Sequence, residues 1–415
     1  MARTEDYRAT IAAARPRAMA AFLRYFRDLD RAEDAFQEAC VRALSAWPKN
    51  GPPRDATGWL ILVGRNAQVD SIRRQQRATN EADEFVTDAA IGGEPDMIER
   101  LDQNHFRDDI LRLLFTCCHP DLSPAQQIAV ALRIISGLSV MQISRAFLVS
   151  EAAMEQRITR AKARIAKAEL PYEAPGAIER TDRLAAVAKM LYLLFNEGYT
   201  AADPASDRAG LCAEAIRLAR MLLEMFPAEP ELMGLLALLL LQHSRTAARF
   251  DEGGFPILLD EQDRLLWNRD TIAEGAALID KAMRHRAPGP YQIQAAIAAL
   301  HARADSPAET DWPQIDQLYQ ALERQAPSPV TTLNRAVAVA RILGVAAALE
   351  LIAPLSEALD GYFYFHGTRG VFYKEMGNTQ EARRSFAKAM ALASSPAEAL
   401  HIRREIERLE QGADR

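Results

Sequence analysis

The residues whose types and spacing most clearly suit a chemical task lie in a basic segment, residues 136–168. Ser139 and Gln142 have capping-box spacing, and Ser150 stands where the N-cap of a second helix is expected, three to four residues after the first helix ends. This is the spacing of a helix-turn-helix. On the second helix an apolar face (Met154, Ile158, Ala161, Ile165) stands opposite a small and polar one (Ala152, Gln156, Thr159, Ala163), a pattern that suits reading of the DNA major groove.

A second basic segment covers residues 59–77. Its apolar positions (Leu60, Val63, Ala67, Ile72) are expected to face a core, while four arginines form a stripe suited to neutralising phosphates. Trp59 and the loop before it are predicted to offer stacking surface for an unpaired base. A buried core position for Trp59 is an equally good interpretation.

An acidic face is predicted on residues 28–47. Ala35, Phe36, Ala39, Ala43 and Trp47 make an apolar stripe, and Asp34, Gln37 and Glu38 project from the opposite side. Carboxylates repel DNA phosphates, so this face suggests a basic protein partner. The alternative is a face that only meets water, just as the alternative for the helix-turn-helix is a structural hairpin with a solvated basic side.

No catalytic, metal or cofactor site is predicted. Cys117 and Cys118 are adjacent and lack a second Cys/His pair at ligand spacing, so we expect packed small residues at the end of a helix that Pro120 stops. The sequence contains no GxSxG, HExxH or phosphate-cradling glycine loop. A thiol nucleophile at Cys117 assisted by His119 is the least favoured interpretation.

The elements that position these residues are predicted to be helices throughout. Ala, Leu, Arg and Glu dominate, and alternating strand patterns do not persist, so an all-α fold is expected for the 415 residues. The longest apolar run, Met233 to Leu241, is too short to span a bilayer, and the N-terminus has no signal-peptide core. Four scattered cysteines fit a reducing compartment, so a cytoplasmic protein without membrane contact is expected.

The formal net charge of −6 is unevenly distributed. Residues 1–170 carry 24 basic and 23 acidic side chains, whereas residues 171–415 carry 26 and 33. Residues 81–107 read as an acidic linker, because carboxylates crowd around Gly92, Gly93 and Pro95. The predicted domains are therefore residues 1–80, the linker 81–107, residues 108–170, and a C-terminal helical domain over residues 171–415.

The C-terminal domain is predicted to be a solenoid of paired helices at about 180–198, 208–226, 229–244, 263–286, 290–303, 311–325, 329–343, 345–358, 361–377, 379–393 and 395–411. In the last pair, Gly370, Tyr373, Gly377, Ala382, Phe386 and Ala389 stand at tetratricopeptide-repeat (TPR) offsets. Shifting back 34 residues gives Ala336, Val339, Leu343, Ala348, Ile352 and Leu355. We therefore predict a TPR-like domain, with a general helical bundle as the alternative.

The three motifs and the acidic linker, in this order, resemble the extracytoplasmic-function (ECF) type of RNA polymerase sigma factor. AEDAFQEACVRAL resembles region 2.2, WLILVGRNAQVDSIRR resembles regions 2.3 and 2.4, and GLSVMQISRAFLVSEAAMEQRITRAKARI resembles region 4.2. The segment from Asp108 to Arg133, followed by the TPR-like part, is similar to the subgroup with a C-terminal TPR-like extension.

The resemblance implies core RNA polymerase, through its β′ clamp helices and β flap, and promoter DNA as partners. It places Asp34, Gln37 and Glu38 on polymerase. It places Trp59, Arg65, Asn66, Asp70, Arg73, Arg74 and Arg77 on the minus-10 element, and Ser150, Glu155, Gln156, Arg157, Thr159, Arg160 and Arg164 on the minus-35 element. Glu155 departs from the family, whose recognition helix is often basic there.

The C-terminal domain is expected to regulate, either by folding back on the sigma domains or by binding a partner protein. The alternative function is a helix-turn-helix operator-binding regulator with a TPR scaffold that works without polymerase.

Overall fold

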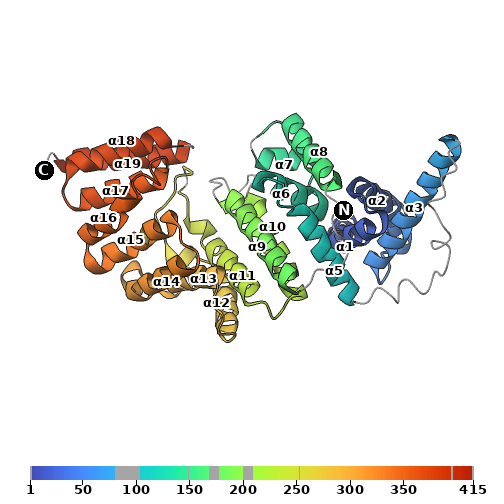
Figure 1. Cartoon of the computed structure of the whole chain (residues 1–415), viewed down its shortest axis with the longest axis horizontal. Coiled ribbons are helices and arrows are strands. Elements are labelled where there is room, and N and C mark those ends of the chain that lie inside the picture. Colours follow the sequence, from blue (N-terminus) through green and yellow to red (C-terminus); the bar gives the residue numbers. More distant parts are fainter. Residues whose placement is uncertain are drawn as a thin grey trace. The chain divides into compact units, whose positions relative to one another are not determined.

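The chain is almost entirely helical in a computed structural model, which describes residues 2–79, 103–147, 149–167, 177–199, 209–251, 253–393 and 396–413 (Figure 1). Within these ranges, the only β pairing is an isolated bridge between Phe250 and Pro256. The all-α prediction is confirmed. Most of the predicted acidic linker lies outside the described residues.

The chain divides into two compact units, Met1–Glu197 and Gly198–Arg415. In the first, α1 (Ala2–Phe26), α2 (Leu29–Asn50) and α3 (Ala56–Thr79) pack around Phe22, Phe36 and Trp47, each at most 2% exposed. Gly64 of α3 lies against the Ala35 carbonyl and the Phe22 ring, where a Cβ atom would clash. The glycine therefore permits α3 to cross α2 closely.

A second group of helices in this unit forms the helix-turn-helix. It comprises α5 (Gln103–Cys117), α6 (Pro124–Ala131), the π-helical turn η2 (Leu132–Ser136), α7 (Val140–Ala146) and α8 (Glu151–Lys167). The predicted capping box is present: the Gln142 amide donates to Ser139 Oγ at 3.1 Å, and the Ser139 amide donates to Gln142 Oε1 at 2.9 Å. Local capping thus fixes where α7 begins.

Helix α9 (Ala177–Tyr199) groups with the first unit up to Glu197. The Arg183 guanidinium lies 5.1 Å from the Phe115 ring centroid of α5. The four domain limits given above from the sequence remain predictions.

The second unit is a succession of helices, with one long break over residues 244–268 between α11 and α12 (Figure 1). They are α10 (Ala209–Met225), α11 (Pro230–His243), α12 (Arg269–Met283), α13 (Pro290–Arg303), α14 (Trp312–Gln325), α15 (Pro329–Leu343), α16 (Val345–Ile352), α17 (Phe363–Glu375), α18 (Thr379–Leu392) and α19 (Pro396–Ala413). Two predicted helices were too long. Residues 264–266 form a separate 3-10 turn before α12, and α16 gives way to a 3-10 turn containing Pro354.

The packing at the end of the solenoid follows the predicted pattern. Gly370 of α17 faces the Phe386 ring of α18, which is fully buried, so the two helices cross where no Cβ would fit. In the preceding pair, Ala336 and Ala348 are likewise fully buried, whereas Leu343 is 71% exposed. These contacts are those of a helical solenoid, while the assignment to the TPR class remains a prediction.

We predict that this unit loses stability in acid through His301 of α13. Burial, with the charges of Arg245 and Arg264, lowers the pKa of this imidazole from 6.5 to about 4. Between these values the unfolded chain binds more protons than the folded one, so stability falls as pH drops from 6.5 through 4, by up to about 3 kcal/mol. Denaturant unfolding of His301→Gln should show a flatter pH dependence in this window, whereas the same change at exposed His285 should leave the pH dependence as it is.

Candidate nucleic-acid and partner interfaces

Helix α2 presents the predicted acidic face to solvent. Asp34, Gln37 and Glu38 are exposed, and Glu38 accepts from Arg42 Nε at 3.0 Å. Their opposite face carries the predicted apolar stripe (Ala35, Phe36, Ala39, Ala43, Trp47), which is at most 2% exposed. The apolar side of α2 is therefore anchored in the core, and the acidic side is exposed to solvent.

Two apolar side chains on this exposed side were not predicted. Val41 is 59% exposed and Leu44 is 47% exposed. They follow Asp34 and Gln37 by seven residues, which places them on the same side of the helix. Exposed apolar groups beside charged ones are a common composition for a protein-binding surface. The sequence could have shown this, because Val41 and Leu44 interrupt the otherwise polar residues on this side of the helix.

Trp59 combines the two interpretations offered from the sequence. Its ring centroid lies 5.5 Å from that of Trp47, so one side packs on the core, yet the residue stays partly exposed. The apolar positions behave as expected at Leu60 (fully buried) and Ala67 (5% exposed).

The polar residues of α3 extend along the helix from this tryptophan. Asn66, Asp70 and Arg74 are exposed, and Arg74 Nε donates to the Asp70 carbonyl at 3.2 Å. Arg73 is half-buried, and Arg65 lies 5.6 Å from the Tyr25 ring centroid. Arg77 belongs to α3, but its side chain lies outside the described residues.

Helix α8 has the two faces predicted for a recognition helix. Met154, Ile158, Ala161 and Ile165 are buried, and Glu155, Gln156, Thr159 and Arg160 share the exposed side. Exposed Ser150 caps the helix, accepting from the Ala153 amide at 3.3 Å. A small-residue face flanked by amide and guanidinium groups is the arrangement that base-edge reading requires.

Two of the arginines assigned to DNA contact the helix-turn-helix itself. Arg157 lies 5.9 Å from the Phe147 ring centroid. Arg164 Nη1 donates to the Asp121 carbonyl at 3.2 Å and to Gln126 Oε1 at 3.4 Å. Gln156 and Arg160, by contrast, are exposed on this helix, and their role in base reading remains a prediction.

A buried carboxylate joins the three-helix part to the helix-turn-helix, and sequence reasoning missed it. Glu33 of α2 is only 5% exposed and pairs with Lys162 of α8, with Arg133 Nε at 3.1 Å and with Arg15 Nη2 at 3.7 Å. Lys162 also binds Asp30 at 2.7 Å. Burial alone would lower the pKa of Lys162, but hydrogen bonds to Asp30 and Glu33 outweigh it and raise the pKa. We call this set the Glu33 cluster.

Arg15 of α1 completes the Glu33 cluster with backbone contacts. Its Nε donates to the Ile134 carbonyl and its Nη2 to the Arg133 carbonyl, both at 3.0 Å. Burial lowers the pKa of Arg15, and Glu33 opposes that shift. The arginine thus satisfies carbonyls of the π-helical turn that regular α-helical bonding leaves free.

Cys117 and Cys118 are packed as predicted, at 0% and 5% exposure. Burial raises the pKa of Cys118 to about 12 and that of Cys117 well above its ordinary value. Both thiols therefore stay protonated at neutral pH, the opposite of what a nucleophile needs.

Within the described ranges, His, Cys, Asp and Glu side chains do not gather into a metal-binding group. Across the same ranges, none of the helices has the length and apolarity needed to cross a bilayer.

Comparison with known proteins agrees with this layout. The family described as Sigma-70 region 2 matches residues 10–78, and the family described as Sigma-70, region 4 matches residues 112–165. A family of unknown function (DUF6596) matches residues 183–283, from α9 to α12.

A relative matches nearly the whole chain. An uncharacterized protein of Rhizobium meliloti (strain 1021) is 62% identical over 400 residues, which cover 96% of this chain and 95% of the relative. The two sigma regions lie on the two helical groups of the first unit, and the third family begins beyond them. The chain therefore belongs to the sigma-70 family of RNA polymerase sigma factors, as an ECF-like member with a C-terminal extension.

Proposed function

We propose that this non-enzymatic transcription factor binds the β′ clamp helices of core polymerase through the exposed face of α2, and the β flap through its region 4. The observation that carries the proposal is the orientation of α2. Its apolar side is buried against α1 and α3, which leaves Asp34, Gln37 and Glu38 together in solvent beside Val41. Acidic and apolar groups on one rigid helix suit a basic helical partner.

In the same proposal, region 4 places α8 in the major groove of the minus-35 element. The Gln156 amide matches the hydrogen-bonding edge of adenine, and the Arg160 guanidinium matches that of guanine. Glu155 accepts a hydrogen bond from a cytosine amino group. Region 2 holds the minus-10 element with the residues of α3. An unstacked base rests on Trp59, and the few kcal/mol that unstacking costs are recovered in these contacts.

The minus-35 assignment predicts a sequence-dependent loss. Gln156→Ala should cost about 1–3 kcal/mol of holoenzyme affinity for promoter DNA and relax the preference at one base pair. Lys167→Ala, in the last turn of the same helix, is the matched control and should weaken all sequences equally. Competition footprinting with single-base variants of the minus-35 element measures both, and an equal loss on every sequence would remove Gln156 from base reading.

The C-terminal extension is proposed to regulate the sigma domains or to bind a partner. Because α9 groups with the first unit up to Glu197 and its Arg183 contacts Phe115 of α5, the truncation retains α9 and removes residues 201–415. We expect transcription per bound polymerase to change at least several-fold. If promoter activity and polymerase affinity are both unchanged, the autoregulatory version is wrong.

The rival proposal, an operator-binding regulator, does not require polymerase. Co-purification with core RNA polymerase separates the two, since the rival predicts no retention. The thiol-enzyme interpretation is opposed by the burial of Cys117, and full activity of Cys117→Ser in reconstituted transcription would dismiss it.

A further inference from the structure

Between α11 and α12 the second unit contains a segment without α-helix, apart from 3-10 turns such as Leu259–Glu261, that lies against later helices. We call residues 249–263 the strap; Glu252 lies outside its described part. Its first turn is held by Asp251, whose Oδ1 accepts from the Gly253 amide at 3.0 Å and from the Phe255 amide at 2.8 Å. The Ile257 amide then donates to the Arg249 carbonyl at 2.8 Å. The strap therefore has its own defined shape.

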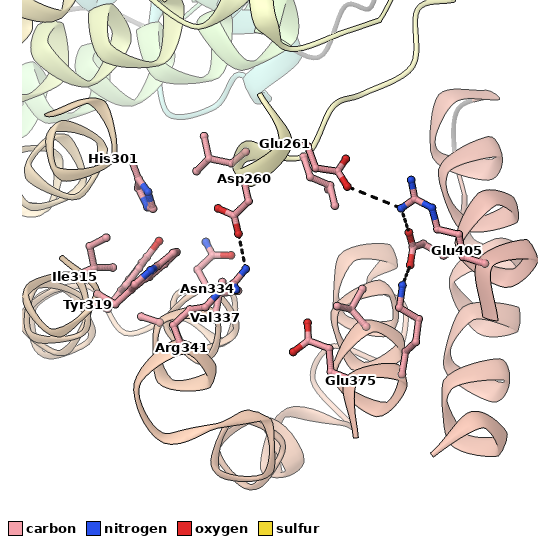
Figure 2. A pocket seen from close by; sticks show the side chains of 17 residues that line it. Asp260, Glu261, His301, Ile315, Tyr319, Asn334, Val337, Arg341, Glu375 and Glu405 are labelled. Atoms are coloured by element: carbon pink, nitrogen blue, oxygen red, sulfur yellow. Dashed lines mark hydrogen bonds and ion pairs between the residues drawn. The ribbon is translucent and has the colours of Figure 1, made fainter. Parts of the chain in front are cut away.

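Three carboxylates of the strap each meet an arginine from α15 or α19. Asp251 lies 3.6 Å from Arg404, Glu261 lies 3.9 Å from Arg408, and Asp260 pairs with Arg341. Figure 2 shows the last two pairs from close by. The Arg404 guanidinium also lies 4.2 Å from the centroid of the Phe255 ring. We call Arg341, Arg404 and Arg408 the arginine row.

The contacts between the strap and the arginine row are exchangeable. The three arginine side chains remain 45% to 55% exposed while paired. Ion pairs this open to water contribute about 0–1 kcal/mol each. An external chain with similar carboxylates can therefore compete for the same row.

A cavity of about 500 Å³ opens beside the strap (Figure 2). Leu258 and Leu259 of the strap form one side of it, and α13, α14, α15, α17 and α19 supply the rest. Its apolar and aromatic wall consists of Trp312, Ile315, Tyr319, Val337 and Val371. The volume falls within the range of ligand pockets, and it remains open with both strap leucines in place.

We propose that the arginine row and this cavity form a docking groove for an extended acidic peptide of a partner protein, and that the strap is the built-in competitor for it. Carboxylates of the partner replace Asp260 and Glu261, and an apolar side chain of the partner enters the cavity. This deepens the proposed partner-binding role of the C-terminal extension. The chemistry of the partner follows from the segment already seated there, which is acidic and apolar.

Competition from the strap determines how tightly the native protein and its variants should bind a free acidic peptide. A segment tethered in the same chain acts at an effective concentration in the millimolar range, so the native protein should bind a free copy weakly. Asp260→Asn with Glu261→Gln removes the strap carboxylates that face Arg341 and Arg408, while Arg408 keeps its 2.8 Å pair with Glu405. A fluorescein-labelled peptide copying residues 249–263 should then bind the full-length variant at least tenfold more tightly than the native chain, by fluorescence polarisation.

Removing two of the three arginines of the row should reverse that gain. Arg341→Ala with Arg408→Ala, added to the neutralised strap, should cost at least tenfold, whereas Arg403→Ala, an exposed arginine of α19 outside the row, should cost less than twofold. A peptide with Phe in place of Leu258 should bind more tightly if its side chain enters the cavity. Circular dichroism of each variant checks that the helices persist.

The proposal is overturned if neutralising the strap leaves peptide affinity unchanged, or if a peptide with lysine at every acidic position binds as well, which would indicate a basic partner. Should the alanine variants unfold, an Arg341→Asp chain tested with a peptide carrying Arg in place of Asp260 provides the charge-swapped rescue, and absence of rescue counts against the row. The assay contains neither polymerase nor DNA, so its failure is distinct from failure of the sigma activity.

Discussion

Replacing Asp34 and Glu38 by alanine is expected to reduce affinity for core RNA polymerase by about 3 kcal/mol, roughly a hundredfold in Kd. Both side chains are exposed on α2 while the helix is anchored from its other side, so the change removes binding groups and leaves the fold intact. Biolayer interferometry with immobilised core enzyme measures the loss of affinity. A larger loss at low salt would show the electrostatic contribution to binding.

The matched control is a second exposed acidic pair, Glu407 and Glu410 of α19, changed to alanine in the same way. This control keeps the net charge of the two variants equal, so it separates a local contact from a general charge effect. If both variants bind core equally well, the region 2.2 assignment on α2 is wrong.

Glu33→Gln is expected to destabilise the first unit by about 3–5 kcal/mol, because it leaves the half-buried cations Arg15, Arg133 and Lys162 without their shared, buried carboxylate. For a unit of this size the Tm should fall by roughly 10 °C. The amide preserves the shape of the side chain, so the loss reports charge and not a cavity.

Asp34→Asn is the natural comparison, since it makes the same chemical change one residue further along α2 at an exposed position. Its Tm should stay within about 1 °C of the native value. Calorimetry on both chains tests the pair, and equal melting temperatures would mean that the Glu33 cluster contributes no net stability.

Features that depend on short-range chain geometry were predictable from the sequence. The two faces of α8 follow from the helical period, and the start of α7 follows from the capping box of Ser139 and Gln142, because both rules act within a few residues. The positions of Gly370 and Phe386 likewise indicated that two helices cross closely there. The end of α16 was missed by six residues because Pro354 acts through a 3-10 turn that the period does not reveal.

Features that depend on distant residues were not predictable. Glu33 and Lys162 are 129 positions apart, and nothing in either local sequence distinguishes buried Glu33 from its exposed neighbour Asp34 except a rotation of about 100° on the helix. The strap falls between the predicted helices 229–244 and 263–286, but its docking on Arg341 depends on a helix 81 positions away. Only the assembled fold brings these charges together.

The Glu33 cluster has a consequence for the length of DNA that the protein can span. Elements named minus-10 and minus-35 are separated by about 25 base pairs, or about 85 Å along the duplex. With Lys162 bonded to α2, the whole of α8, about 25 Å long, stays beside region 2. On the proposed function, engaging both elements at once requires α8 to move away from region 2. That movement breaks the pairs from Lys162 to Asp30 and Glu33, so the distance between the two promoter elements decides whether these pairs persist.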